Sequence, residues 1–118
     1  MAGRLTTHVL DTARGRPAAG VRVEAFRLAG AVRERVADLT TNAEGRCDGP
    51  VLEGRAFAAG TYELLFHVGD YFRGAGLALP DPAFLDLVPL RFGIAEAGQH
   101  YHVPLLISPF GYSTYRGS

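Results

Sequence analysis

The sequence predicts an all-β fold, and three observations carry that prediction. Short runs of alternating apolar and polar residues recur along the chain, as expected for strands with one buried face. The 15 glycines and 7 prolines are spread along the chain as turn signals. No helical pattern of about ten residues separates the runs, which argues against a doubly wound α/β fold. Short strands at this spacing indicate either a sandwich or a barrel.

Three strands are predicted in the first half of the chain. Residues 5–10 alternate, which places Thr6 and His8 on the same face of the first strand. Residues 21–28 and 32–39 also alternate between apolar and charged side chains. Each run ends near glycine, proline or asparagine, the residues that favour turns.

The second half of the chain adds a turn, a helical turn and three strands. Residues 42–45, Asn-Ala-Glu-Gly, predict a turn because glycine tolerates a positive φ. Residues 81–86 predict a single helical turn, since an aspartate stands at the N-cap and a proline at the first helical position. The alternating runs 61–68, 87–94 and 99–108 predict the last strands.

The charge balance and the cysteine count exclude several classes of protein. The 12 basic and 12 acidic residues form no runs, which argues against a nucleic-acid or an electrostatic membrane partner. All basic residues are arginine, so lysine chemistry is excluded. The single cysteine, Cys47, allows no intramolecular disulfide. With no apolar run of about 20 residues and no apolar signal core at the start, we expect a cytoplasmic protein.

Histidines are the first candidates for chemistry. His100 and His102 flank one residue of a strand, so both imidazoles lie on one face about 6–7 Å apart along it. This pair fits a metal-ligand pair, a metal-free catalytic or binding site, or a structural role. By itself, the pattern favours structural roles for His8 and His67.

Three further features stand outside the strands. Arg46 follows the predicted turn, where its guanidinium either presents a rigid fork to a planar ligand or is simply solvated. Cys47 is a weak candidate nucleophile because no motif of a cysteine enzyme surrounds it. Residues 108–118 contain three aromatic side chains, which is unusual for a free tail and indicates that the segment is held in a cleft or interface.

The chain also resembles a known family in several motifs that occur in the same order. The motifs are LTTHVLD at residues 5–11, TNAEGRC at 41–47, GDYF at 69–72, HYHVPLL at 100–106 and the tetrapeptide YRGS at 115–118. Together they resemble the transthyretin-related 5-hydroxyisourate hydrolases over nearly the whole chain. The last of these motifs is the signature of that family.

This resemblance implies a fold, an assembly and a reaction. The fold would be a transthyretin-like two-sheet β-sandwich of about eight strands with one short helix, in a single domain over residues 1–118. The assembly would be a homotetramer, a dimer of dimers with active sites in the channel between the dimers. The reaction would add water to a ring carbonyl of 5-hydroxyisourate and break the adjacent C–N bond, as a step of urate (purine) degradation. No metal and no organic cofactor is implied.

The resemblance also implies which residues act. His102 would be the general base on water or part of a relay to it, His8 would orient water or substrate, and Arg46 would bind substrate and stabilise negative charge. Ser118 would pass a proton or hold water, while Tyr115 and Arg116 would fix the tail and help to bind substrate. His100 would be structural or support the site from outside.

Three alternatives of other classes stay open at this point. A transthyretin-like carrier would bind an aromatic small molecule without turnover. A zinc hydrolase would use His8, His100 and His102 as ligands. A noncatalytic β-sandwich would serve as an interaction module, since fold alone does not define function.

Overall fold

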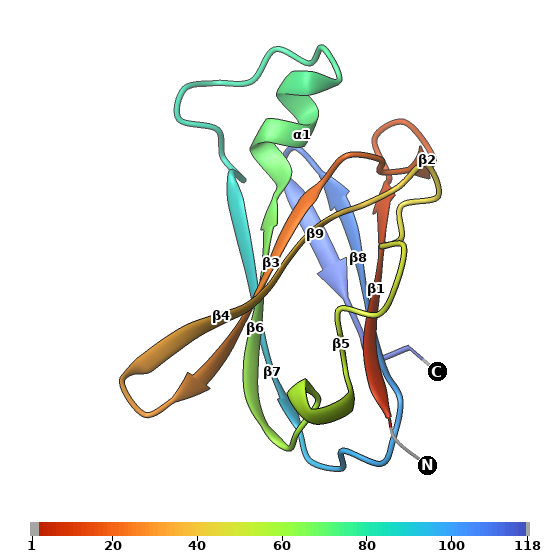
Figure 1. Ribbon diagram of the computed structural model, residues 1–118. Helices are drawn as coiled ribbons and strands as arrows, with labels where there is room; N and C mark the ends of the chain where they lie inside the picture. The colour runs from red at the N-terminus through yellow and green to blue at the C-terminus, as the bar shows by residue number, and fades with distance from the viewer. Residues whose placement is uncertain (1–2, 118) are drawn as a thin grey trace.

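Residues 3–117 of the computed structural model form two β-sheets that face each other (Figure 1). In the first sheet the strand order is β2-β1-β8-β9, and β5 also pairs with β1. In the second sheet the order is β4-β3-β6-β7. The alternation left a sandwich and a barrel open, while the resemblance implied a two-sheet sandwich with one short helix, and the structure confirms that sandwich. The first sheet contains β1 (Arg4–Asp11), β2 (Arg16–Pro17), β5 (Leu52–Glu53), β8 (Tyr101–Ser108) and β9 (Gly111–Thr114).

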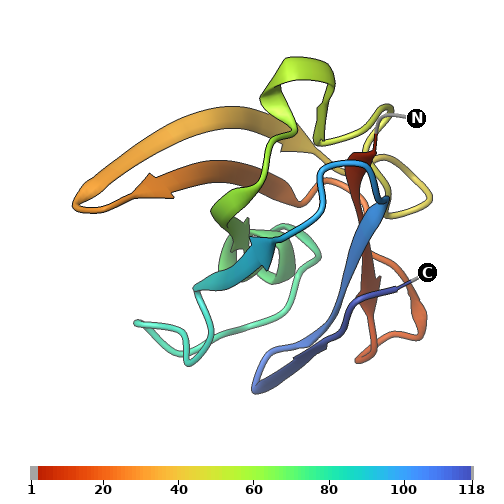
Figure 2. The ribbon, with the colours of Figure 1, turned by 90° about the horizontal axis from the view of Figure 1, so that it is seen from below.

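The second sheet is antiparallel throughout and is built from four strands of similar length. They are β3 (Arg22–Ala29), β4 (Val32–Thr40), β6 (Gly60–His67) and β7 (Leu87–Ile94). The β3–β4 hairpin extends away from the rest of the molecule, as both views show (Figures 1 and 2). In the first sheet, by contrast, β1 and β8 run parallel, with Thr6 opposite His102 in the register.

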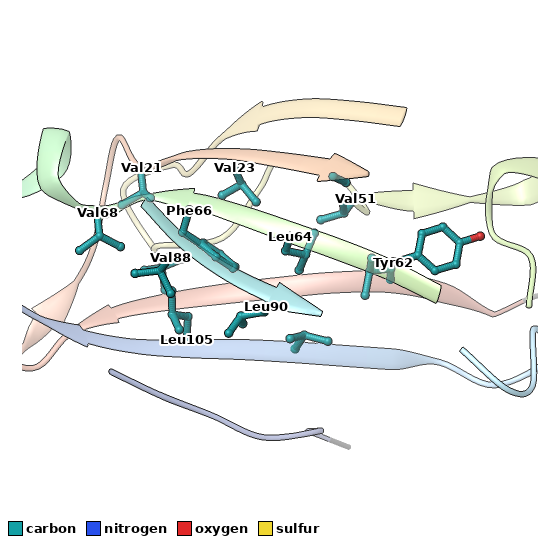
Figure 3. Packing of buried hydrophobic residues seen from close by; sticks show 14 of the residues in the cluster. Val21, Val23, Val51, Tyr62, Leu64, Phe66, Val68, Val88, Leu90 and Leu105 are labelled. Carbon is teal, nitrogen blue, oxygen red and sulfur yellow. The ribbon is translucent and has the colours of Figure 1, made fainter. Parts of the chain in front are cut away.

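The core lies between the sheets and consists of the inward positions that the alternation predicted. The large side chains of Tyr62, Leu64 and Phe66 in β6 are fully buried. Figure 3 shows them packed among the other core side chains. The Tyr62 hydroxyl donates a hydrogen bond of 2.8 Å to the carbonyl oxygen of Ala58, so its polar atom is satisfied. Burial of each such side chain contributes roughly 1.5–3 kcal/mol to the free energy of unfolding.

All six predicted strands are present, with ends that agree to within two residues. Among the described residues the structure adds β2, β5 and β9 and a single 3-10 turn at Gly54–Ala56. These segments have two to four residues. They are too short for alternation to reveal them.

The predicted helical turn over residues 81–86 is wrong. That segment bends without a helix, and its Phe84 is exposed. The helix α1 instead covers Val68–Gly74, directly after β6. Its spacing places Val68, Tyr71 and Phe72 on one buried face, and this burial outweighs the capping signal at 81–86, where only Leu85 packs partly against the core.

None of the helices within residues 3–117 has the length and apolar character needed to cross a membrane.

Candidate active site

A hollow of about 540 Å³ opens on the outer face of the first sheet, between β1, β8 and the loop that follows the 42–45 turn. Strand pairing explains why distant residues meet here. Thr6 of β1 and His102 of β8 are partners in the parallel register, so their half-buried side chains leave the sheet side by side. The hollow is lined by Arg4, Thr6, Thr7, Arg46, Cys47, Asp48, Gly49, Pro50, His100 and His102.

The loop carrying Arg46 is fastened to β1 by its backbone. The Val9 N–H donates to the Gly45 carbonyl at 2.8 Å, and His8 and Arg46 form an isolated antiparallel bridge. Gly45 has a φ of +76°, and a Cβ there would collide with the Val9 carbonyl oxygen, so this turn requires glycine. The Asn42 side chain accepts hydrogen bonds from two N–H groups of the same turn. The predicted turn is therefore confirmed, and it places Arg46 next to His8.

His8 lies beside the hollow but does not line it. Its Nε2–H donates to the carbonyl oxygen of Glu44 at 2.9 Å, which leaves Nδ1 as the nitrogen with a free lone pair. The ring is thus held by the same turn that positions Arg46.

His102 is the histidine best placed to accept a proton. Burial lowers its pKa below the ordinary value of 6.5, and the nearby Arg46, His8 and His100 lower it further because each disfavours a second positive charge. The imidazole is therefore uncharged at neutral pH. Its Nδ1 lies 2.8 Å from the Thr6 hydroxyl.

The residues after β9 lie along the end of β8. The Arg116 guanidinium stacks on the Tyr101 ring at 3.9 Å and donates to the carbonyl oxygen of His100 at 3.1 Å. The Gly117 N–H donates to the carbonyl oxygen of His102 at 2.7 Å. A Cβ on Gly117 would lie 2.7 Å from Cδ2 of His102, so a larger residue there would push against the ring.

The structure distributes the expected site residues over two places. Arg46 and His102 line the hollow, and His8 stands next to Arg46. Tyr115 and Arg116 instead line a second cleft of about 450 Å³ between β7 and β9. Ser118 lies outside the described residues.

Sequence reasoning did not single out Thr6, Arg4 or Asp48 as parts of the hollow. The alternation places Thr6 on the same face as His8, but its contact with His102 depends on the parallel pairing of two strands far apart in the chain. That pairing has no local signal, so spacing within the motif at residues 5–11 could not have identified Thr6 as a partner of His102. Arg4, at the start of β1, and Asp48, two residues after Arg46 in the loop, also line the hollow.

The remaining candidates are placed as follows. Burial raises the pKa of the Cys47 thiol, and the nearby Asp48 raises it further, so this side chain is a protonated thiol at neutral pH and a poor nucleophile. His67 lies away from the hollow, where its Nε2 is 2.7 Å from the Glu24 carboxylate. Within residues 3–117, no three His, Cys, Asp or Glu side chains are grouped as the ligands of a metal ion usually are.

Comparison with known proteins gives consistent matches. A curated relative from Rhizobium meliloti, named 5-hydroxyisourate hydrolase 2, is 68% identical over 98% of this chain and 97% of its own length. The structure of Klebsiella pneumoniae 5-hydroxyisourate hydrolase has a TM-score of 0.82 and 38% identity, covering 98% of this chain and 99% of that one. A crystal structure of (S)-allantoin synthase has a TM-score of 0.94 and 47% identity over 99% of this chain, which spans only 44% of that protein.

The description of the matching family model agrees with these relatives. That model, described as HIUase/Transthyretin family, matches residues 5–117. The match includes both strands of the hollow and the loop with Arg46. With the model covering nearly the whole chain, this protein belongs to the HIUase/Transthyretin family.

Proposed function

We propose that this chain is an enzyme that hydrolyses 5-hydroxyisourate to 2-oxo-4-hydroxy-4-carboxy-5-ureidoimidazoline in urate degradation. Water adds to a ring carbonyl, and the adjacent C–N bond breaks. The observation that carries the proposal is the 68% identity, over 97% of its length, to a relative named 5-hydroxyisourate hydrolase 2. The hollow supports it, because hydrolysis of a cyclic amide needs a base for water and a positive group for the oxyanion.

We assign roles to the residues of the hollow on their geometry. His102 is the general base, since its lowered pKa keeps a lone pair available at neutral pH. Arg46 binds the oxygen-rich planar ring and stabilises the developing negative charge. His8, fixed by Glu44 and next to Arg46, orients water or substrate.

We assign supporting roles to the end of the chain. Arg116 holds the segment against the Tyr101 ring and the carbonyl oxygen of His100, which supports a role in fixing the tail beside His102. We also propose that Tyr115 and Arg116 help to bind substrate. Within one chain, both residues line the second cleft. The role of Ser118, to pass a proton or hold water, rests on the resemblance alone.

We propose a homotetramer built as a dimer of dimers. Among the described residues, β7 and β9 are edge strands that pair on one side only, and both line the same cleft. A second copy that paired with these edges would continue both sheets. On the outer face of the first sheet, Leu10 and Leu106 are register partners, an apolar area that a second dimer would cover. The molecular mass measured by light scattering tests whether the protein is a tetramer.

We also propose that the protein is located in the cytoplasm.

The test of function follows the absorbance of freshly generated 5-hydroxyisourate with and without the protein. We expect a faster loss of substrate that is insensitive to a chelator. A carrier or an interaction module would leave the rate unchanged, and a zinc hydrolase would lose activity with the chelator. An unchanged rate in the presence of folded protein would refute the proposal.

A further inference from the structure

The Thr6 side chain contacts both histidines of the hollow. Its Oγ1 lies 2.8 Å from Nδ1 of His102 and 3.3 Å from Nε2 of His100. The proposed function assigns no role to Thr6 and leaves His100 without one. The following inference rests on that function, because it concerns how His102 is prepared to act as the base.

The number of polar hydrogen atoms on Thr6, His100 and His102 limits which hydrogen bonds these three side chains can form together. A threonine hydroxyl has one hydrogen to donate and can accept at its oxygen, while a neutral imidazole has one N–H and one lone pair. Thr6 can donate to only one of the two histidines. If it donates to Nε2 of His100, it accepts from Nδ1–H of His102, and Nε2 of His102 then carries the lone pair.

The surroundings of His102 favour this arrangement. Within residues 3–117, Nε2 of His102 has no hydrogen-bond partner, so it is the nitrogen left available to a molecule in the hollow. Cδ2, on the same side of the ring, lies against Gly117, which restricts rotation of the ring. A tautomer is set by the hydrogen bond that the other ring nitrogen makes.

We infer that Thr6 is a positioning residue for the reaction: its hydroxyl accepts a hydrogen bond from Nδ1–H of His102, donates to Nε2 of His100, and so holds His102 with an unprotonated Nε2 toward the hollow. His102 then takes a proton from water at Nε2 as the water oxygen bonds to the ring carbonyl carbon and the C=O π electrons move onto the carbonyl oxygen. When the C–N bond breaks, the imidazolium returns that proton to the leaving ring nitrogen. The resulting imidazolium keeps its hydrogen bond to Thr6.

The residues around His102 affect how readily its imidazole takes up a proton. Arg46, His8 and His100 are the groups that disfavour its protonation. Arg4 and Asp48 also line the hollow. An acceptor on Nδ1 stabilises the imidazolium, so its loss weakens the base as well as releasing the ring.

The experiment compares Thr6→Val, which keeps the shape of the side chain, with Thr6→Ser, which keeps the hydroxyl. We expect Thr6→Val to lower kcat on the order of ten- to a hundred-fold, as loss of an orienting hydrogen bond does, with a smaller change in KM. Thr6→Ser recovers most of that loss. Thr12→Val is the matched control: its hydroxyl bonds to the carbonyl oxygen of Ile107, at the other end of the same strand pair.

Nitrogen NMR of the His102 ring provides a readout that does not depend on turnover. In the native protein at neutral pH we expect the proton on Nδ1, and in Thr6→Val a mixture of both tautomers. Protonation of Nε2 in the native protein, native kcat in folded Thr6→Val, or a Thr6→Ser variant as slow as Thr6→Val would each overturn the inference. Failure of the native protein to consume 5-hydroxyisourate would instead refute the proposed function, and the NMR result would still decide how Thr6 bonds.

Discussion

At the scale of single residues, His102 and His100 differ in burial although they flank the same tyrosine. His102 is half-buried and bonded through Nδ1, while His100 is exposed. We expect His102→Asn to fold normally and to lose kcat on the order of 10²–10⁴, the usual contribution of a positioned base. Steady-state kinetics together with a thermal melt measures both. Full activity in His102→Asn combined with a dead His100→Asn would show that the other histidine is the base.

The lowered pKa of His102 predicts a pH profile. Burial, followed by the unfavourable interaction of a protonated His102 with Arg46, His8 and His100, places this pKa below 6.5. The unprotonated base is therefore fully present at neutral pH and is lost only as the pH falls through that lower value. We expect the acid limb of kcat/KM, which reports the free enzyme, to have its midpoint below 6.5. A midpoint above 6.5 would contradict the assignment.

Arg46 offers a test of geometry at constant charge. Its backbone is fixed to β1 beside His8, so its guanidinium enters the hollow from a defined point. Only a guanidinium presents a planar fork to a ring with adjacent oxygens, so we expect Arg46→Lys to raise KM and lower kcat together. Native kinetics in Arg46→Lys would indicate that Arg46 is only a solvated loop residue with no part in the reaction.

At the scale of elements, a buried carboxylate joins α1 to the first strand. The Asp11 side chain is fully buried, accepts from Nε of Arg14 at 2.9 Å and from the Tyr71 hydroxyl at 2.7 Å. Burial alone would raise the pKa of Asp11, but the hydrogen bonds from Arg14 and Tyr71 outweigh it and lower the pKa below 3.8. This group ties the helix to the sheet.

We expect Asp11→Asn to reduce the free energy of unfolding by about 2–3 kcal/mol, since it replaces hydrogen bonds to a charged acceptor. Because the folded pKa is depressed, the stabilisation is fully present above 3.8 and is lost as the pH falls through the folded value. Urea melts over the acid range measure this, and the native protein should show a loss that Asp11→Asn lacks. Equal acid sensitivity in both would assign the loss to other carboxylates. Tyr71→Phe, which keeps the ring packing, should cost less.

At the scale of the whole molecule, the end of the chain connects the site to the proposed assembly. It bonds to β8 next to His102 through Gly117 and Arg116, while Tyr115 and Arg116 line the cleft at the exposed sheet edges. We expect removal of residues 115–118 to leave a sandwich that melts cooperatively, because no core strand is lost. Turnover should fall close to background and the tetramer should weaken modestly.

Circular dichroism checks the fold of the truncated protein, light scattering its mass and substrate absorbance its activity. A truncated protein that stays tetrameric and works at the full rate would remove the tail from the mechanism. It would also remove the strongest sequence argument for a hydrolase over a carrier. The fold itself cannot make that distinction, because one fold serves different functions.

The sequence by itself determined the strands of the core and the class of the fold. Alternation at Tyr62, Leu64 and Phe66 is a local property of neighbouring residues, and these side chains are buried as predicted. The 42–45 turn was equally readable, because Gly45 needs a positive φ. The motifs around His8, Arg46 and His102 also pointed to the family that the comparisons support.

Only the tertiary structure decided where the helix lies and how the site is built. The helix forms at Val68–Gly74 because burial of one short apolar face outweighs a capping signal at residues 81–86. The contact between Thr6 and His102 joins residues 96 positions apart. Such a contact arises from parallel strand pairing, which depends on how both sheets close over the core and leaves no trace in local spacing.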